Sequence, residues 1–178
     1  EYGTKVKYDE EINDNPEFFG KVRAQYANGD SGGRDIHVVT DWMAARMIRL
    51  GYVQKLDHSE MPNVKANLIE GPKAPPFDPK RDWSVPWQSG FGGIIYRKDK
   101  VKREPKSVDD LFDPDYKGKV TMLTEMRDTV GVVAAGMGFD SETASNDEFM
   151  EAIDRSGEAS DSGQIRGFTG NEYTKDIT

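Results

Sequence analysis

The stretch KVTMLTEMRDTVGVVAAGMGFD, residues 119–140, decides the fold of this chain. It begins with an apolar run over 120–123, continues through polar and charged residues, and ends in a small-residue segment over 129–137. The apolar run predicts a strand and the small-residue segment predicts a helix. In α/β proteins, ligands bind where a strand ends in polar side chains and leads into a helix. We therefore expect a ligand-binding edge at this turn.

Glu125 and Asp128 are the two carboxylates of this turn. If the turn is helical, their spacing places both side chains on one face. Because neighbouring carboxylates repel each other unless a cation lies between them, the pair is a candidate cation clamp. The alternative is that both stabilise the positive end of the helix dipole, with Arg127 or a lysine neutralising them. The spacing alone favours this second interpretation.

The composition limits the class of partner. The chain has 178 residues, of which 35% are hydrophobic and 31% are charged, and its formal net charge is -8. This excess of carboxylates argues against nucleic acid and anionic membranes as partners, and it is compatible with cationic ligands. The sequence has no cysteine, which excludes a disulfide framework, a thiolate metal site and thiol catalysis.

Predicted strands and helices alternate along the chain, which indicates an α/β fold with mostly parallel pairing. The predicted strands are 4–8, 35–39, 90–96, 120–123 and 164–168, and the predicted helices are 16–27, 43–50, 108–112, 129–137 and 145–155. Ser107 and Asp110 form the pattern of a capping box at the start of the 108–112 helix. Loops are predicted over 57–82 and 156–163.

No sequence pattern points to catalysis or to a metal centre. His37 lies in a predicted strand and His58 in a polar turn, and neither has a second histidine or cysteine at metal-ligand spacing. The sequence contains no GxSxG, P-loop or GxGxxG motif. We therefore predict no catalytic residue, no metal site and no cofactor.

Tryptophan is the other residue type that could contact a ligand. Trp42 follows the predicted strand over 35–39, two residues after Thr40. A tryptophan at the carboxyl end of a strand can form the wall of a ligand crevice, or it can pack into the core, and for Trp42 both interpretations stay open. For Trp83 and Trp87, which flank a proline, packing is the favoured interpretation.

The order of these segments resembles that of a known family. The resemblance rests on DIHVVTDWMAARM (35–47), GYVQKLD (51–57), WSVPW (83–87), GGIIYRKD (92–99) and PKSVDDLFDPDYKGKVTMLTEMRD (105–128). These stretches are similar to the extracytoplasmic polyamine-binding proteins of ABC importers, the spermidine/putrescine receptors, which are type II periplasmic binding proteins. The run from Lys106 to Lys119 is also similar to iron and sulfate receptors, so it indicates the fold more than the ligand.

The resemblance implies parts of two α/β lobes with mostly parallel sheets, joined by a hinge near 93–96. Residues 1–95 correspond to part of lobe 1 without its opening strand, and residues 96–178 to part of lobe 2 without its C-terminal remainder. We accordingly expect a fragment. Its open sheet edges predict self-association with a second copy.

The resemblance also implies four ligand-binding residues. Thr40 and Trp42 match the family's hydroxyl residue and the aromatic residue that follows it after a first-lobe strand. Glu125 and Asp128 match two carboxylates three residues apart in the second lobe. The familiar order there is Asp then Glu, so the reversed order moves each charge by one methylene and affects the preferred length of polyamine.

The function implied by the resemblance is that of an extracytoplasmic solute receptor. It would capture putrescine or spermidine in a cleft between lobes and deliver it to an ABC permease and its ATPase, without catalysis. Its location would be the periplasm, or the outer face of the cell membrane as a lipoprotein. The alternatives are the same fold binding an amino-acid derivative or iron, and an enzyme or a sensor module on a periplasmic-binding fold.

Overall fold

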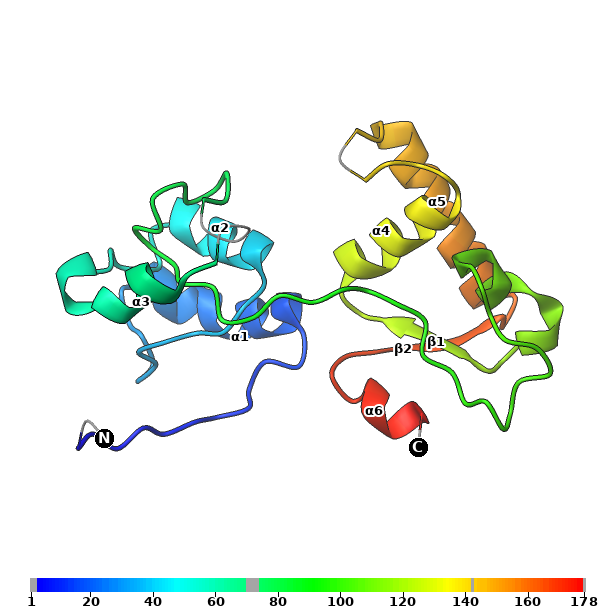
Figure 1. Cartoon of the computed structure of the whole chain (residues 1–178), viewed down its shortest axis with the longest axis horizontal. Helices are drawn as coiled ribbons and strands as arrows, with labels where there is room; N and C mark the ends of the chain where they lie inside the picture. The colour runs from blue at the N-terminus through cyan, green and yellow to red at the C-terminus, as the bar shows by residue number, and fades with distance from the viewer. Residues whose placement is uncertain (1–2, 70–73, 142, 178) are drawn as a thin grey trace. The chain divides into compact units, whose positions relative to one another are not determined.

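The computed structural model describes residues 3–69, 74–141 and 143–177 (Figure 1). The chain divides into two compact units, Glu1–Gly90 and Phe91–Thr178. This division lies close to the predicted boundary at residues 95 and 96, whose assignment to two lobes stays a prediction. Each unit has its own hydrophobic core.

The first unit is built from helices and loops. Its elements are α1 (Asn15–Ala27), α2 (Asp41–Arg49), the 3-10 turn η1 (His58–Glu60) and α3 (Pro62–Asn67). The predicted helix over 16–27 is confirmed, and Asp14 begins it by accepting a hydrogen bond from the backbone N–H of Glu17 at 2.9 Å. The segment predicted to be loop-rich, 57–82, contains both short elements: η1 agrees with the turn predicted at His58, whereas the sequence does not predict α3.

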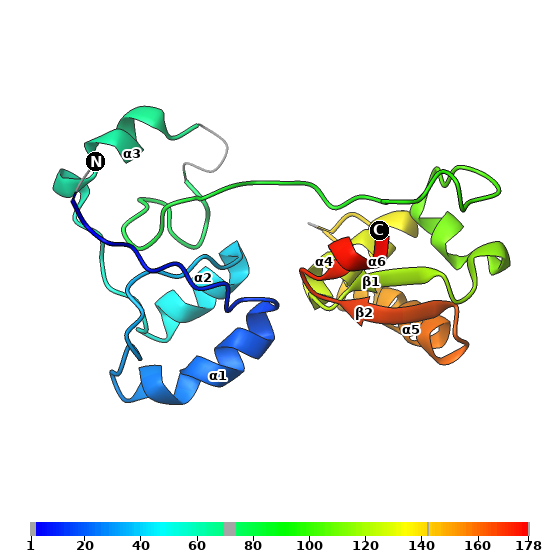
Figure 2. The same ribbon diagram turned by 90° about the horizontal axis from the view of Figure 1, so that it is seen from below.

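The core of the first unit lies between α1 and α2, which are side by side in Figure 2. Aromatic and aliphatic side chains of α1 meet two methionines of α2 there. The buried members are Phe18, Phe19, Val22, Tyr26, Met43 and Met47. Both helices therefore bury one face against each other.

Three predicted strands, 4–8, 35–39 and 90–96, are wrong, because these segments form no ladder within the described residues. β-branched side chains favour an extended backbone, but a strand is stable only when its N–H and C=O groups pair with a neighbour. Ile36 shows the result, since its side chain is 86% exposed. Local propensity therefore predicts strands here for which the described residues supply no pairing partner.

The second unit contains a small parallel sheet with helices packed against it. Its elements are η3 (Val108–Phe112), η4 (Pro114–Tyr116), β1 (Val120–Leu123), α4 (Met126–Gly136), α5 (Asn146–Asp161), β2 (Ile165–Thr169) and α6 (Tyr173–Ile177). β1 pairs with β2 in parallel, and Leu123 is the register partner of Thr169. The predicted α/β class and the parallel pairing are therefore confirmed in this unit.

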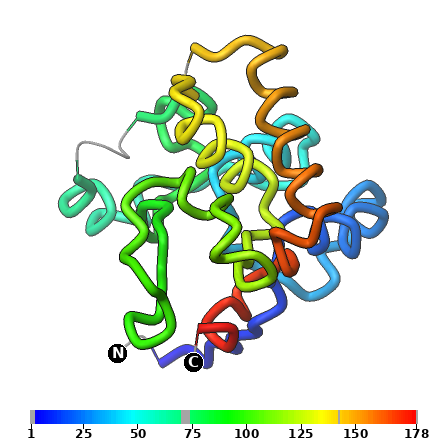
Figure 3. Tube along the Cα trace, turned by 90° about the vertical axis from the view of Figure 1, so that its right-hand side faces the viewer, coloured from blue at the N-terminus to red at the C-terminus, as the bar shows by residue number. Residues whose placement is uncertain are grey.

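Two helices connect the paired strands. Figures 1 and 3 show α4 and α5 side by side, and their buried residues Val133, Ala134, Ala152 and Ala159 share one core with the sheet. The predicted loop over 156–163 is wrong because α5 continues to Asp161. Serine and glycine there suggested a loop, but the Ser156 hydroxyl donates to the carbonyl of Ala152 at 2.8 Å and stays inside the helix.

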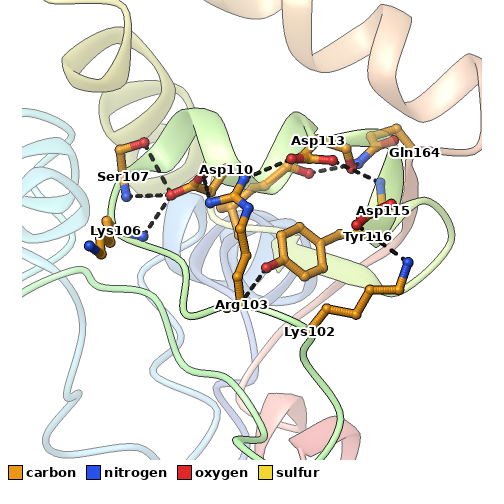
Figure 4. A network of polar contacts seen from close by, with 10 residues as sticks. Lys102, Arg103, Lys106, Ser107, Asp110, Asp113, Asp115, Tyr116 and Gln164 are labelled. Atoms are coloured by element: carbon orange, nitrogen blue, oxygen red, sulfur yellow. Dashed lines mark hydrogen bonds and ion pairs between the residues drawn. The ribbon is translucent and has the colours of Figure 1, made fainter.

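A polar network holds the segment that precedes β1 (Figure 4). Asp110 accepts hydrogen bonds from the backbone N–H groups of Lys106 at 2.6 Å and Ser107 at 3.0 Å, which confirms the predicted capping box, although η3 is a 3-10 turn. Arg103 bridges Asp110 and Asp113. The Lys106 N–H, the Arg103 guanidinium and the Ser107 N–H lower the pKa of Asp110 to about 2.

Gln164 connects this network to the sheet. Its side-chain amide donates to the carbonyls of Leu111 at 2.8 Å and Asp113 at 2.9 Å (Figure 4). Because Gln164 directly precedes β2 while Leu111 and Asp113 lie in the segment before β1, these bonds tie that segment to the start of β2. The sheet is thus anchored at one end, and its carboxyl end leads into α4.

Candidate ligand-binding site

The turn from β1 into α4 is held by hydrogen bonds to both strands. The N–H of Thr124 donates to the carbonyl of Thr169 at 2.9 Å, and the hydroxyl of Thr129 donates to the carbonyl of Leu123 at 2.7 Å. The N–H of Thr129 also donates to the carbonyl of Glu125 at 3.1 Å. These bonds give the turn a defined backbone on which side chains can be positioned.

Glu125 and Asp128 both lie at this turn. Glu125 is the N-cap residue of α4, with φ -64° and ψ 100°, and Asp128 belongs to the first helical turn. The side chain of Glu125 is half-buried and that of Asp128 is exposed. This position suits the interpretation as helix-dipole partners, because carboxylates at a helix N-terminus complement its dipole. The exposed Asp128 carboxylate is also open to a cationic ligand, whereas one carboxylate oxygen of Glu125 is buried. Their role as ligand-binding residues stays a prediction.

A mostly apolar groove of about 480 Å³ is lined in part by Thr124 and Met126, the chain neighbours of Glu125. It is formed by the end of β1, the start of α4, one face of α5 and Phe168 of β2. Its lining residues are Leu123, Thr124, Met126, Thr129, Val130, Ile153, Ser156, Gly157, Ser160, Asp161 and Phe168. Local sequence patterns do not predict this groove, because segments far apart in the sequence form its walls.

Thr40 and Trp42 lie at the start of α2, in the first unit. The carbonyl of Thr40 accepts hydrogen bonds from the N–H groups of Met43 and Ala44, and its own N–H donates to Asn15 Oδ1 at 3.2 Å. Trp42 is half-buried and packs against the core of the first unit. Packing is therefore one of its roles, while contact of either residue with a ligand stays a prediction.

Both predicted pairs occupy the same kind of position. Thr40 and Trp42 lie in or next to the first turn of α2, and Glu125 and Asp128 lie in or next to the first turn of α4. The two members of each pair are thus close together within their own unit. In both cases the N-cap residue, Thr40 or Glu125, has an extended backbone and leads directly into the first helical turn.

Thr169 is a further polar residue at the carboxyl end of the sheet. Its side chain is 6% exposed, and its hydroxyl forms no hydrogen bond with any other described residue. The strand predicted from the sequence ends at Phe168 and does not include Thr169. The only available signal was a polar residue directly after a predicted strand.

The two histidines lie apart from these positions. His37 is half-buried between the rings of Phe18 and Tyr26, and its Nε2 lies 3.0 Å from the Tyr26 hydroxyl. Burial lowers the pKa of His37, and the nearby Arg34 guanidinium lowers it further. Within the ranges that the structure describes, no group of three or more His, Cys, Asp or Glu side chains is arranged to hold a metal ion.

A membrane-spanning helix would need a long apolar segment. Among the residues described, every helix is too short or too polar to cross a bilayer.

Comparison with solved structures shows the fold. The chain is similar to the spermidine/putrescine ABC transporter substrate-binding protein PotD from Streptococcus pneumoniae, solved in complex with calcium and HEPES. The TM-score is 0.61 at 20% sequence identity, over 92% of this chain and 48% of that structure. This likeness agrees with the predicted type II periplasmic-binding-protein fold.

Comparison with known sequences shows relatives among periplasmic binding proteins. The chain is 29% identical over 155 residues to the spermidine/putrescine-binding periplasmic protein of Escherichia coli K12, covering 85% of this chain and 42% of the relative. It is 29% identical over 133 residues to spermidine/putrescine-binding periplasmic protein 1 of Haemophilus influenzae, covering 74% of this chain and 36% of the relative. The chain thus spans less than half the length of these relatives.

A family-level comparison covers most of the chain. The pattern of the family described as bacterial extracellular solute-binding protein matches residues 23–166, which include the starts of both α2 and α4. Because this match extends over more than half of the 178 residues, the chain belongs to the bacterial extracellular solute-binding protein family.

Proposed function

We propose that this chain is part of an extracytoplasmic receptor that captures a polyamine, putrescine or spermidine, for delivery to an ABC permease and its ATPase. The observation that carries the proposal is the carboxylate pair Glu125 and Asp128 at the turn from β1 into α4. Family membership and the names of the relatives support it. The location would be the periplasm, or the outer cell surface as a lipoprotein.

The chemistry of the proposed site is binding without catalysis. Carboxylates accept hydrogen bonds from the ammonium groups of a polyamine, and each such charge-assisted bond contributes roughly 1.5–3 kcal/mol. A cation over the face of Trp42 would add about 0.5–2 kcal/mol. Binding of this kind requires no nucleophile, no general base and no bond cleavage, so we propose that the protein is not an enzyme.

These contributions set the affinity expected of the 178 residues alone. Two carboxylates and one tryptophan provide roughly 4–8 kcal/mol before the cost of ordering a flexible polyamine is subtracted. Micromolar affinity needs about 8 kcal/mol net. We therefore expect this chain to bind spermidine with a Kd no tighter than about 1 mM.

Nuclear magnetic resonance titration of the chain with spermidine tests this proposal. The backbone amide signals over 124–129 should shift with spermidine at constant ionic strength. Asp128→Asn and Glu125→Gln should each weaken the response about tenfold, which corresponds to about 1.4 kcal/mol. Asp35→Asn is the matched control, because Asp35 is an exposed carboxylate of the first unit and forms no ion pair with a described residue.

Two results would contradict the proposal. The first is an unchanged spermidine response in both Asp128→Asn and Glu125→Gln, which would leave these carboxylates as partners of the helix dipole only. The second is tighter binding of Fe(III) or of amino acids than of polyamines in the same titration, which would assign the fold to another solute. Micromolar spermidine affinity of these residues alone would contradict the expected weak binding.

A further inference from the structure

The groove of the second unit extends away from the carboxylate pair along α5. Three of its apolar side chains remain substantially exposed, with Met126 at 56%, Phe168 at 45% and Ile153 at 38%. They come from α4, β2 and α5, so the exposed apolar surface is continuous across three elements. Contiguity of exposed apolar side chains is one feature of interaction sites.

α5 presents an apolar stripe to this groove in addition to its buried face. Ala152, Ser156 and Ala159 face the core. Ile153 and Gly157 line the groove, and Met150, one turn earlier, is 52% exposed. A Cβ added at Gly157 would meet no atom within 4 Å, so the groove is open above this residue.

A row of carboxylates flanks the apolar stripe of α5. Its members are Asp147, Glu151, Asp154, Glu158 and Asp161. They recur at alternating spacings of four and three residues, which places them on one helix face, and the row is about 21 Å long. None forms an ion pair with a described residue, whereas the one basic residue of the helix, Arg155, pairs with Asp109 at 2.8 Å.

We propose that this groove docks a cationic amphipathic helix of a partner protein. Apolar side chains at helical spacing on the partner would fill the groove between Met126, Ile153 and Phe168. Lysine or arginine side chains on the neighbouring face would meet the carboxylate row, of which Asp161 also lines the groove. Recognition of a helix in an apolar groove by regularly spaced anchors is a common binding mode. This inference goes beyond polyamine capture and does not rest on it.

Charge complementarity selects this occupant over the others. An anionic membrane would be repelled by the carboxylate row. The α5 helix of a second copy would bring the same row of like charges against the first. A polyamine would satisfy the charges, but it has no side chains to cover the exposed apolar residues. A cationic amphipathic helix meets both the apolar and the acidic features.

The test uses the full 178-residue chain and a fluorescein-labelled synthetic helix of about 16 residues, which matches the length of the row. The peptide carries leucine at helical spacing along one face and lysine on the neighbouring face, and binding is measured by fluorescence anisotropy. Saturable binding should weaken as salt is raised, because salt screens the carboxylates. A peptide of the same composition in scrambled order should bind about tenfold more weakly.

Gly157→Leu is the first diagnostic variant. A Cβ there meets no atom within 4 Å, so a leucine side chain can extend into the groove, and it should weaken peptide binding about tenfold while the melting temperature is maintained. Gly20→Leu is its matched control. Gly20 is also an exposed glycine within a helix and has open space around it, but it lies in α1 of the first unit.

The triple variant Asp154→Asn, Glu158→Gln, Asp161→Asn removes three charges while keeping the size of the side chains, including that of Asp161 in the groove lining. It should weaken peptide binding about tenfold at low salt and remove most of the salt dependence. A triple variant with Glu10→Gln, Asp35→Asn and Glu60→Gln makes the same change in net charge on the first unit. It should leave the peptide affinity unchanged.

Four results would overturn the proposal. One is the absence of saturable binding. Another is equal affinity for the scrambled peptide, which would show adsorption of any polycation. A third is competitive displacement of the peptide by spermidine with no effect of Gly157→Leu, which would place the peptide at the polyamine site. The fourth is a dimer in light scattering that Gly157→Leu dissociates, which would make a second copy the occupant.

Discussion

The hydroxyl of Thr129 donates a hydrogen bond to the carbonyl of Leu123 at 2.7 Å, and this bond ties the first turn of α4 to the last residue of β1. Leu123 is in turn the register partner of Thr169 in the parallel sheet. The turn that carries Glu125 is thereby connected to both strands. The geometry of this turn therefore depends on the Thr129 side chain, which reaches from the first turn of α4 to the end of β1.

Removal of this hydroxyl should loosen the turn. Thr129→Val keeps the shape of the side chain but leaves the Leu123 carbonyl without this donor, so the free energy of unfolding should fall by about 1 kcal/mol. Thr129→Ser is the control, because it keeps the hydroxyl and therefore the hydrogen bond to Leu123. Urea unfolding measures the stability, and faster hydrogen exchange at the Thr124 amide would report local opening. Equal exchange rates in both variants would show that the bond does not hold the turn.

Trp42→Leu should affect stability as well as binding. Trp42 packs against the core of the first unit, so its replacement should cost about 1–3 kcal/mol in thermal or urea unfolding. If the indole also contacts polyamine, the spermidine response of the variant should fall more than that of Trp42→Phe, which keeps an aromatic face. A large loss of stability with an unchanged spermidine response would assign Trp42 to the core alone.

Stability of the first unit should decrease on acidification because of His37. Burial and the Arg34 guanidinium hold its folded-state pKa below the ordinary value of 6.5, while Glu11, paired with Arg34, and the Tyr26 hydroxyl are the other titratable groups nearby. The unfolded chain therefore binds the proton first as the pH falls below 6.5, and this favours unfolding. The stability that neutral His37 contributes to the folded state is fully present above pH 6.5. It is lost progressively as the pH falls from 6.5 to the folded-state pKa of His37.

His37→Gln removes this titration. Urea unfolding of the wild-type chain and the variant between about pH 7.5 and pH 5 should show a smaller loss of stability in His37→Gln, since carboxylates and other groups titrate equally in both. Parallel curves for the two proteins would contradict the assignment of the pH dependence to His37.

Among the residues of the loop over 75–82, Asp78 should be the one whose substitution lowers the free energy of unfolding most. Its buried carboxylate accepts hydrogen bonds from the N–H groups of Asp82 at 2.9 Å, Trp83 at 3.1 Å and Ser84 at 2.9 Å. Asp78→Ala would leave these donors without their acceptor, so the free energy of unfolding should fall by about 3 kcal/mol. Asp78→Asn keeps one acceptor oxygen and should cost less. Equal effects of both variants in urea unfolding would contradict this account.

Self-association of the 178-residue chain is the remaining expectation. β1 and β2 form a two-stranded sheet among the described residues, and apolar side chains such as Ile36 are exposed on segments outside any ladder. Unpaired backbone and exposed apolar side chains favour pairing with another copy. Light scattering should show a mass above that of one chain as concentration rises, and a constant monomer mass at high concentration would contradict it.

The sequence by itself predicted those features that depend on neighbouring residues. The helix over 16–27, the capping box of Ser107 and Asp110, and the strand over 120–123 were all predicted correctly. Each rests on local spacing or on a hydrogen bond between residues three or four apart. The positions of Glu125 and Asp128 at a helix start also followed from this local pattern.

Tertiary structure decided the features that depend on distant partners. The β-branched segment over 35–39 forms no strand, because a ladder requires a second segment that local spacing does not specify. Ser156 stays helical, because its helix face packs into the core with Ala152 and Ala159. The groove at Gly157 arises for the same reason, since packing of β1, β2, α4 and α5 places side chains from 123 to 168 around one space.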